Sequence, residues 1–173
     1  VHPREKYVEV MDGDIGYWVA EELSESLSSN FDFNKPVLGK SKTGEEISGW
    51  KTQHPFIDRE SRILTADYVT MESGTGCVHI APGHGLDDYL TGIENGLEVY
   101  CPLTDYGTYV DDGMIPSALV GVSVLEKSTG CPANDSVLEI LESKNALLAK
   151  QNHHHQYPHC WRSKTPVVFR AMD

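Results

Sequence analysis

The sequence has little of several features that would assign it to a class directly. No apolar run approaches the length of about 18 residues that a membrane-spanning helix needs. Its first residues, VHPREKY, contain no apolar stretch of the kind found in a secretory signal. The four cysteines are well separated and form no CxxC pair, which favours a reducing compartment over a disulfide framework or a structural zinc site. We therefore expect a cytoplasmic protein without a membrane partner.

Positive charge is also scarce. Lysine and arginine number 14 against 26 aspartates and glutamates, so the formal net charge is −12. A surface that binds nucleic acid broadly needs many basic residues to neutralise phosphates, and this composition argues against one. The cations are nevertheless uneven, because the stretch from Ser143 to Met172 has no acidic residue and five basic ones. That stretch is either a small basic face or a solvated tail that joins a larger body.

The length of 173 residues suits one domain with a hydrophobic core of its own. Because the chain begins at Val1 without methionine and ends just after an extended apolar stretch, we interpret it as a fragment of a longer protein. Short segments rich in β-branched and aromatic residues are separated by turn signals, which indicates strands. These segments are 7–11, parts of 37–53, 63–71, 77–81, 97–101, 108–110, 147–151 and 166–170.

Helical periodicity is found in fewer places. Three segments have apolar side chains at the spacing of an amphipathic helix: 18–27, 87–95 and 134–145. In the second of them, Tyr89, Leu90 and Ile93 share one face, and Gly96 is placed to end the helix. Many short strands, few helices and frequent turns predict a β-rich α+β domain, with a β-barrel and helices outside it.

The residues with most chemistry lie between Gly74 and Tyr89, in the segment GTGCVHIAPGHGLDDY. The two glycines around Thr75 permit positive φ and a close approach of the backbone to a ligand, and they would equally form an ordinary hairpin turn. His79 lies near the end of a predicted strand, a Pro-Gly loop follows, and Asp88 opens a predicted helix. This order predicts a histidine and a carboxylate that point from two elements into one space.

Each of these residues also has a structural interpretation. An isolated histidine in a strand usually belongs to the packing, and an acidic residue at a helix start usually caps the helix or complements its dipole. As a functional pair, Asp88 could bind an ammonium group, while His79 could hydrogen-bond an ester oxygen or move a proton near pH 7. Together with His84 they could bind zinc, but the spacing matches no zinc motif, and we predict no metal site.

The segment GTGCVHIAPGHGLDDY closely resembles the editing-site segment of the class I isoleucyl-tRNA synthetases. Two further segments agree with this resemblance. HPFIDRESRILTADYVTMESGTG, residues 54–76, is similar to the stretch that leads into the editing-site segment. YPHCWRSKTPVVFRA, residues 157–171, resembles the exit strand by which the inserted editing domain rejoins the catalytic fold. Valyl and leucyl relatives share the GTG turn and an equivalent of Asp88, but they usually have lysine or methionine in place of His79.

The resemblance implies that residues 1–173 form a barrel-like editing domain, with 152–173 leading back to the catalytic domain of a larger synthetase. The implied reaction is hydrolysis, by water, of the ester that joins a wrong amino acid, chiefly valine, to the 3′ end of isoleucine tRNA. Binding at the synthetic site rejects an amino acid smaller by one methylene only weakly, so a second, smaller site hydrolyses what fits. The implied partners are this tRNA end and the remaining domains. ATP and magnesium would serve the synthetic domain, and no cofactor is expected here.

The resemblance also implies roles for particular residues. Asp88 would anchor the α-ammonium group of the misattached amino acid. His79 would line the amino-acid pocket, help to exclude isoleucine and hydrogen-bond near the ester. Gly74, Thr75 and Gly76 would form the turn beside the terminal adenosine. No residue is assigned as a general base.

One part of the family's site is expected outside this chain. The family has a threonine-rich segment before the first strand, and this chain begins after the place where that segment would lie, so we expect these residues to supply one wall of the site. The residues leave three other functions open. The chain could be a module that binds an aminoacyl-adenosine end without cleaving it, the editing domain of a valyl or leucyl relative, or an unrelated metallohydrolase.

Overall fold

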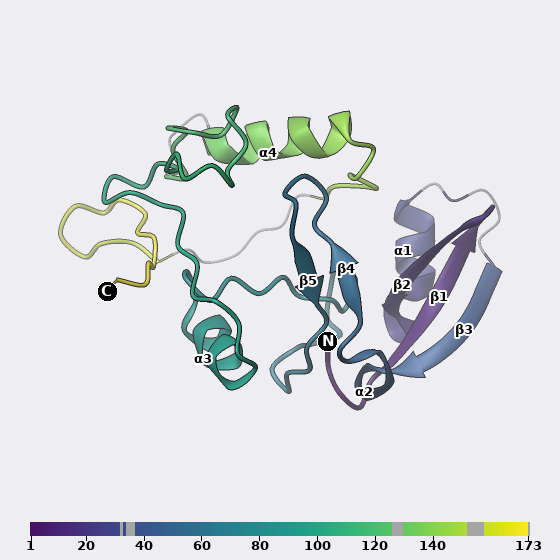
Figure 1. Ribbon diagram of the computed structural model, residues 1–173. Helices are drawn as coiled ribbons and strands as arrows, with labels where there is room; N and C mark the ends of the chain where they lie inside the picture. The colour runs from purple at the N-terminus through teal and green to yellow at the C-terminus, as the bar shows by residue number, and fades with distance from the viewer. Residues whose placement is uncertain (32, 34–36, 126–129, 152–157, 173) are drawn as a thin grey trace. The chain divides into compact units, whose positions relative to one another are not determined.

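The computed structural model describes residues 1–31, 33, 37–125, 130–151 and 158–172. The chain divides into two compact units. Unit 1 comprises Val1–Gln53 and Glu60–His79, and unit 2 comprises His54–Arg59 and Ile80–Asp173. Figure 1 shows the strands, which all belong to unit 1, and the two longest helices, which belong to unit 2. Each unit is described by itself, and a single editing domain over 1–173 stays a prediction.

Unit 1 is built on a three-stranded antiparallel sheet in the order β2-β1-β3. Its strands are β1 (Lys6–Asp12), β2 (Ile15–Ala20) and β3 (Val37–Thr43). A two-residue turn joins β1 to β2, and Gly13 in this turn has a φ of 60°, which side chains other than hydrogen rarely permit. The strand predicted at 7–11 is therefore confirmed.

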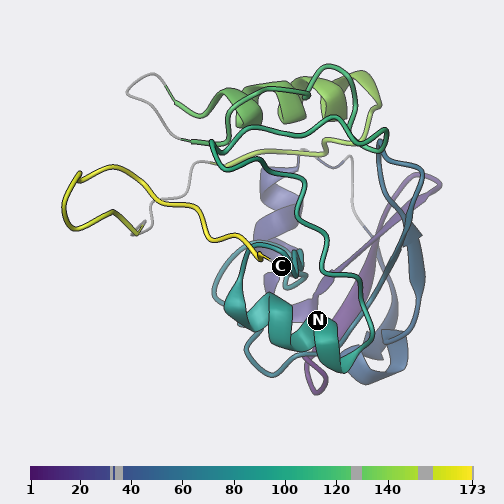
Figure 2. The ribbon, with the colours of Figure 1, turned by 60° about the vertical axis from the view of Figure 1, so that its left-hand side comes forward.

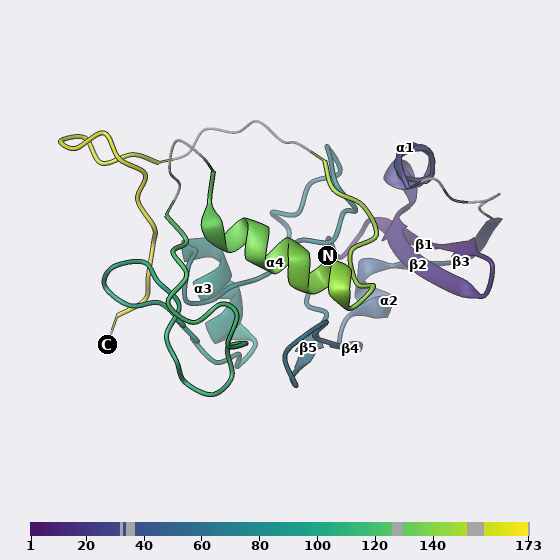
Figure 3. The same ribbon diagram turned by 90° about the horizontal axis from the view of Figure 1, so that it is seen from above.

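One face of this sheet is covered by α1 (Ser24–Asn30), as the view from above shows (Figure 3). Side chains at alternate positions of a strand share a face, so Val8 and Val10 of β1 point in the same direction. They pack with Val19 of β2 and Leu27 of α1 in a buried apolar cluster. Burial of this cluster fixes α1 against the sheet.

The opposite face of the sheet is organised around Tyr7, which is fully buried and packs with Ala20 and Ile47. Burial raises the pKa of Tyr7 above its ordinary value, so its side chain stays a neutral hydroxyl. The hydroxyl oxygen accepts a hydrogen bond from the backbone N–H of His2 at 2.9 Å and donates one to the carbonyl oxygen of Gly76 at 2.8 Å. Tyr7 thus connects the sheet to a turn that lies 69 residues away in the sequence.

The helix predicted at 18–27 begins later than expected. Trp18 and Val19 belong to β2, where they pair with residues of β1. Strand pairing and the burial of Val19 outweigh the helical spacing of the apolar side chains, because helix propensity is a weak preference by comparison. After β2 the chain forms a short 3-10 helix, η1 (Glu21–Leu23), which leads into α1.

A short helix, α2 (Gly44–Ile47), follows β3 at the place where we expected a turn between strands. Thr43 and Glu46 form a capping box. The Thr43 hydroxyl accepts a hydrogen bond from the Glu46 N–H at 3.3 Å, and the Glu46 carboxylate accepts one from the Thr43 N–H at 2.7 Å. Two backbone donors at the helix start are thereby satisfied, which explains why the chain begins a helix there.

A two-stranded antiparallel sheet of β4 (Lys51–Gln53) and β5 (Glu60–Arg62) completes unit 1. The strands predicted at 63–71 and 77–81 are wrong, because these residues are extended or bent chain without ladder pairing. In 63–71 the apolar residues Leu64 and Val69 are buried in the packing, whereas Val78 in 77–81 is 50% exposed. Hydrophobic and β-branched composition did not specify a pairing partner for either segment.

Unit 2 contains α3 (Leu86–Glu94) and α4 (Pro132–Ser143), and both were predicted. In the described part of unit 2, strand-like pairing is limited to three isolated bridges: Leu103–Tyr109, Thr108–Ser123 and His159–Pro166. The strands predicted at 97–101 and 147–151 are therefore wrong. The strand predicted at 108–110 is reduced to two isolated bridges, and the one predicted at 166–170 is reduced to one.

The apolar face predicted for α3 is present but exposed. Tyr89, Leu90 and Ile93 are 40%, 51% and 54% exposed, whereas the buried positions of the helix are Thr91 and Gly92. A Cβ on Gly92 would lie 2.8 Å from Cγ of Pro82, so the helix packs closely against the proline ring, on the side opposite to the one that periodicity indicated.

The fold class is confirmed in its coarser form only. The described residues form a mixed α/β architecture, with two small antiparallel sheets and four α-helices. No closed barrel is found among them, because most segments predicted as strands have no ladder partner. None of the helices in the described ranges combines the length and the apolar character that crossing a membrane requires.

The buried hydroxyl of Tyr7 gives a test of unit 1. Tyr7→Phe is expected to lower the free energy of unfolding by about 1–2 kcal/mol, because the buried Gly76 carbonyl loses its donor. Urea denaturation of the purified chain measures this change. Tyr106→Phe is the matched control, since Tyr106 is 84% exposed, and it should change stability by less than about 0.5 kcal/mol. Equal losses in the two variants would contradict the role given to the buried hydroxyl.

Candidate functional site

The GTG turn, residues 74–76, is fastened to the main sheet of unit 1. The Thr75 carbonyl accepts a hydrogen bond from the N–H of Ala20, the last residue of β2, at 2.8 Å. The next carbonyl, that of Gly76, accepts the Tyr7 hydroxyl. Inside the turn, the Thr75 hydroxyl oxygen accepts a hydrogen bond from the Cys77 N–H at 3.2 Å. The turn therefore has a fixed backbone before any ligand binds.

The two glycines of this turn have different surroundings. Both have positive φ, 71° for Gly74 and 74° for Gly76. A Cβ on Gly76 would lie 2.5 Å from the Cβ of Ala20, so the turn packs directly against β2 at this residue. A Cβ on Gly74 would meet nothing within 4 Å. The Gly74 side of the turn is thus the open one, where a ligand can reach the backbone.

His79 is the last residue of unit 1, and its side chain is exposed. Because the strand predicted at 77–81 is absent, no sheet orients the imidazole. His79 follows the GTG turn by three residues, and the strand that was predicted to orient its side chain is not formed. Its exposed ring can hydrogen-bond or exchange a proton with a ligand.

Asp88 lies in the first turn of α3, in unit 2, and is partly buried. Its Oδ2 accepts a hydrogen bond from the backbone N–H of Ala81 at 3.1 Å, on the other side of the loop that precedes the helix. Asp87 lies beside it and is exposed. The Asp88 side chain is therefore directed back over the loop 82–85. A negative charge in the first turn of a helix is stabilised by the helix dipole. The structural and the functional interpretations of Asp88 are compatible, because a carboxylate has a second oxygen for a ligand.

The loop between Ala81 and α3 is held by contacts with distant residues that no local pattern in the sequence indicates. Nδ1 of His84 lies 3.0 Å from the carbonyl oxygen of Phe169, which is 85 residues away. The Gly83 carbonyl accepts a hydrogen bond from the Ala171 N–H at 2.8 Å. His84 thus has a partner in the packing of unit 2, as the structural interpretation of a histidine predicts.

The residues predicted for the site are divided between the two units. The GTG turn and His79 belong to unit 1, whereas Asp88 belongs to unit 2. Within the part of the chain that the structure describes, no three histidine, cysteine, aspartate or glutamate side chains are grouped so that they could hold a metal ion. The histidines at 153–155 lie outside the described residues.

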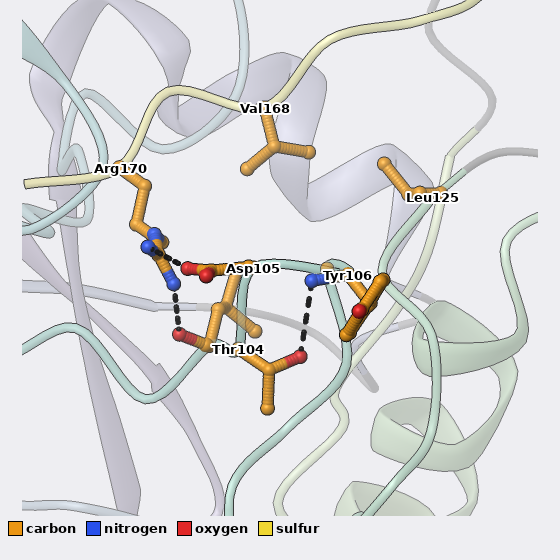
Figure 4. Close-up of a pocket in the computed structure, with 8 residues that line it drawn as sticks. Thr104, Asp105, Tyr106, Leu125, Val168 and Arg170 are labelled. Atoms are coloured by element: carbon orange, nitrogen blue, oxygen red, sulfur yellow. Dashed lines mark hydrogen bonds and ion pairs between the residues drawn. The ribbon is translucent and has the colours of Figure 1, made fainter.

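A shallow pocket of about 380 Å³ lies within unit 2 (Figure 4). Its lining consists of Leu103, Thr104, Asp105, Tyr106, Gly107, Leu125, Val168 and Arg170. The Arg170 guanidinium donates a hydrogen bond to the Leu103 carbonyl oxygen at 2.8 Å and forms an ion pair with Asp105. Figure 4 shows these two charged side chains directed toward one another. In the sequence, Arg170 is only one cation of the basic stretch 143–172. Its pairing with Asp105, which lies 65 residues earlier, has no local signal.

Comparison with known proteins gives relatives along the whole chain, although no family model matches it. The chain is 46% identical over 171 residues to the isoleucine–tRNA ligase of Nitratidesulfovibrio vulgaris strain DP4, and the alignment covers 99% of this chain and 17% of that protein. It is 40% identical over 173 residues to the isoleucine–tRNA ligase of Staphylococcus aureus strain JH9, covering 99% of this chain and 18% of that protein. The chain therefore spans less than a fifth of the length of these curated relatives.

Among solved structures, one described as the crystal structure of GlLeuRS-CP1 aligns with a TM-score of 0.46 and 15% sequence identity. The alignment covers 86% of this chain and 59% of that chain. A likeness of this degree is too low to support a conclusion about fold or function.

Two alanine substitutions separate the requirements of the GTG turn. Gly74→Ala is expected to lower the free energy of unfolding by about 1 kcal/mol, because only the positive φ opposes the new side chain. Gly76→Ala is expected to cost about 2–4 kcal/mol, because its Cβ also collides with Ala20. Urea denaturation of both variants measures the difference. A cost for Gly74→Ala equal to or above that of Gly76→Ala would show that the turn is not packed against β2 as described.

Proposed function

We propose that this chain, which is homologous over 99% of its length to one segment of the isoleucine–tRNA ligases, is their editing domain and hydrolyses valine from misacylated isoleucine tRNA. The observation that carries the proposal is the 46% identity over 99% of the chain. Coverage of this extent includes the segment 74–89, where the side chains suited to ester hydrolysis lie. The barrel-like arrangement expected of an editing domain is part of the same proposal.

The proposed reaction is attack by water on the ester between the amino acid and the 3′-terminal adenosine. The Asp88 carboxylate binds the α-ammonium group of the amino acid, and its second contact, to the Ala81 N–H, keeps it in place. An ion pair of this kind holds the substrate by its one positive charge and so positions the ester relative to the water. No side chain of this chain is assigned as a nucleophile.

The GTG turn and His79 have complementary parts in this proposal. The GTG turn lies beside the terminal adenosine with its open side at Gly74, where a side chain larger than hydrogen would obstruct the approach of the adenosine to the backbone. His79 lines the amino-acid pocket, hydrogen-bonds near the ester and limits the pocket to side chains smaller than that of isoleucine. A pocket that excludes isoleucine by size removes valine while it spares the correct product.

The charge of the chain is consistent with such a partner. An editing domain receives only the flexible 3′ end of the tRNA, so few phosphates need to be neutralised, and a net charge of −12 is compatible with binding. In the proposal, the remaining domains of the synthetase provide most of the tRNA contacts in the cytoplasm. ATP and magnesium serve the synthetic reaction in those domains.

The charge of Asp88 is tested by Asp88→Asn in the full-length ligase that contains this segment. An asparagine oxygen can still accept the Ala81 N–H, so the loop is retained while the charge is lost. The kcat/KM for deacylation of valyl-tRNA(Ile) is expected to fall by about tenfold or more, the contribution of one charged hydrogen bond. Asp87→Asn is the matched control, because Asp87 is exposed and adjacent, and its kcat/KM should stay within about twofold. Undiminished deacylation by Asp88→Asn would remove Asp88 from the proposed site.

The part of His79 in size selection is tested by His79→Ala in the same enzyme. Removal of the ring enlarges the amino-acid pocket, so hydrolysis of correctly charged isoleucyl-tRNA(Ile) is expected to rise by about fourfold, the contribution of one buried methylene group. Release of labelled isoleucine from purified isoleucyl-tRNA(Ile) measures this rate. If hydrolysis of valyl-tRNA(Ile) and hydrolysis of isoleucyl-tRNA(Ile) fall by the same factor, His79 acts on the ester without setting the size of the pocket.

A further inference from the structure

Three segments that are far apart in the sequence meet in unit 2 beside the helix that carries Asp88. They are the loop 82–84, the stretch 100–105 and the segment 169–171. Figure 2 shows the last of these, at the yellow end of the chain, running back toward the beginning of α3. We call the meeting of these three segments the junction. The proposed function uses only Asp88 from this region and assigns no role to the junction.

The loop is bound to the segment 169–171 by two hydrogen bonds on successive residues. The Gly83 carbonyl oxygen accepts the Ala171 N–H at 2.8 Å, and Nδ1 of His84 lies 3.0 Å from the Phe169 carbonyl oxygen. A carbonyl oxygen can only accept, so His84 must carry a proton on Nδ1 and act as the donor. The two contacts together fix both the position and the direction of the loop relative to the segment.

The other two sides of the junction are also fixed. Gly83 is buried so closely against the stretch 100–105 that a Cβ on it would lie 2.3 Å from the Tyr100 carbonyl oxygen. Arg170, between the two residues that bind the loop, donates to the Leu103 carbonyl at 2.8 Å and pairs with Asp105. The segment 169–171 is therefore held both by the loop 82–84 and by the stretch 100–105.

A short series of contacts connects His84 to Asp88. The backbone N–H of His84 donates to the Ala81 carbonyl oxygen at 2.9 Å, and the Ala81 N–H donates to the Asp88 carboxylate at 3.1 Å. The peptide groups on both sides of Ala81 therefore join the histidine to the carboxylate. A displacement of His84 therefore changes the direction of the Ala81 N–H, which orients the Asp88 carboxylate.

We propose that His84 is a positioning residue for Asp88. Through the hydrogen bond from His84 to the Phe169 carbonyl oxygen, the orientation of the Asp88 carboxylate depends on the segment 169–171. This inference rests on the proposed function, since it concerns how Asp88 is held for the misacylated substrate. Positioning of a reacting ester requires accuracy well below one ångström, so the loss of one such bond reduces turnover although His84 touches no substrate.

Two substitutions of His84 in the full-length ligase separate the donor from the ring. His84→Asn retains an N–H donor at about the place of Nδ1, whereas His84→Phe retains the ring volume and loses the donor. The kcat for deacylation of valyl-tRNA(Ile) is expected to fall by about tenfold in His84→Phe and to stay within about threefold in His84→Asn. The rate of isoleucyl-adenylate formation, measured on the same samples, should be unchanged in both.

Hydrogen exchange gives a second readout of the same proposal. Peptides that cover residues 80–90 and 166–172 should exchange faster in His84→Phe than in His84→Asn, because the junction opens more often without the donor. An undiminished kcat in His84→Phe, or a loss in His84→Asn as large as that in His84→Phe, would overturn the proposal. The first result would show that the bond is not needed, and the second that a retained donor does not preserve the rate.

Asp88→Asn measured in parallel separates this inference from the proposed function. Full activity in Asp88→Asn would reject the role of Asp88 itself, whereas a loss there with full activity in His84→Phe would reject only the positioning role. If His84→Phe also loses adenylate formation, the proposal is tested by deacylation in Ala171→Pro. Proline lacks the N–H that binds the Gly83 carbonyl oxygen, so this variant loosens the segment without changing His84. Ala171→Gly retains that N–H and is its control. Deacylation as fast in Ala171→Pro as in Ala171→Gly would overturn the proposal.

Discussion

The hydrogen bond from the buried Tyr7 hydroxyl to the Gly76 carbonyl is the constraint on which the rest of unit 1 depends. It places a polar contact inside an apolar cluster, where an unpaired carbonyl would be costly. With the Ala20–Thr75 bond it forces residues 74–76 to lie across the edge of the sheet. The positive φ of the two glycines follows from this placement, because the chain must reverse tightly while it contacts β2. Packing and backbone geometry thus produce a rigid turn whose open side is available to a ligand.

The loop before α3 reaches the same rigidity in a different way. It has no apolar cluster of its own, and its order comes from backbone hydrogen bonds and from the absence of a side chain at Gly83. Polar contacts of this kind have to be complete, because each missing partner leaves a half-buried group unsatisfied. The side-chain bond from His84 and the ion pair of Arg170 complete the set. The loop is therefore sensitive to residues that lie far from it in the sequence.

The sequence predicted well what depends on local pattern and poorly what depends on a distant partner. The strand around Tyr7 and the helices α3 and α4 were found, because periodicity and turn residues specify them locally. Segments 63–71 and 77–81 have strand composition but no partner, and composition does not supply one. Asp88 and the GTG turn were predicted as site residues from their motif, and this assignment stays a prediction. The contacts of His84 with Phe169 and of Arg170 with Asp105 span 85 and 65 residues, and no local pattern marks such pairs.

The proposed chemistry requires position from the protein more than it requires reactivity. Water is a sufficient nucleophile when the ester is held still, so the chain has to fix the ammonium group, the adenosine and the ester. The Asp88 carboxylate is fixed through Ala81, and the turn beside the adenosine through Tyr7 and β2. His79 differs from both, because it is exposed and no strand orients it. In the proposal, the bound substrate orients this imidazole, whereas the Asp88 carboxylate and the turn are held in place before the substrate binds.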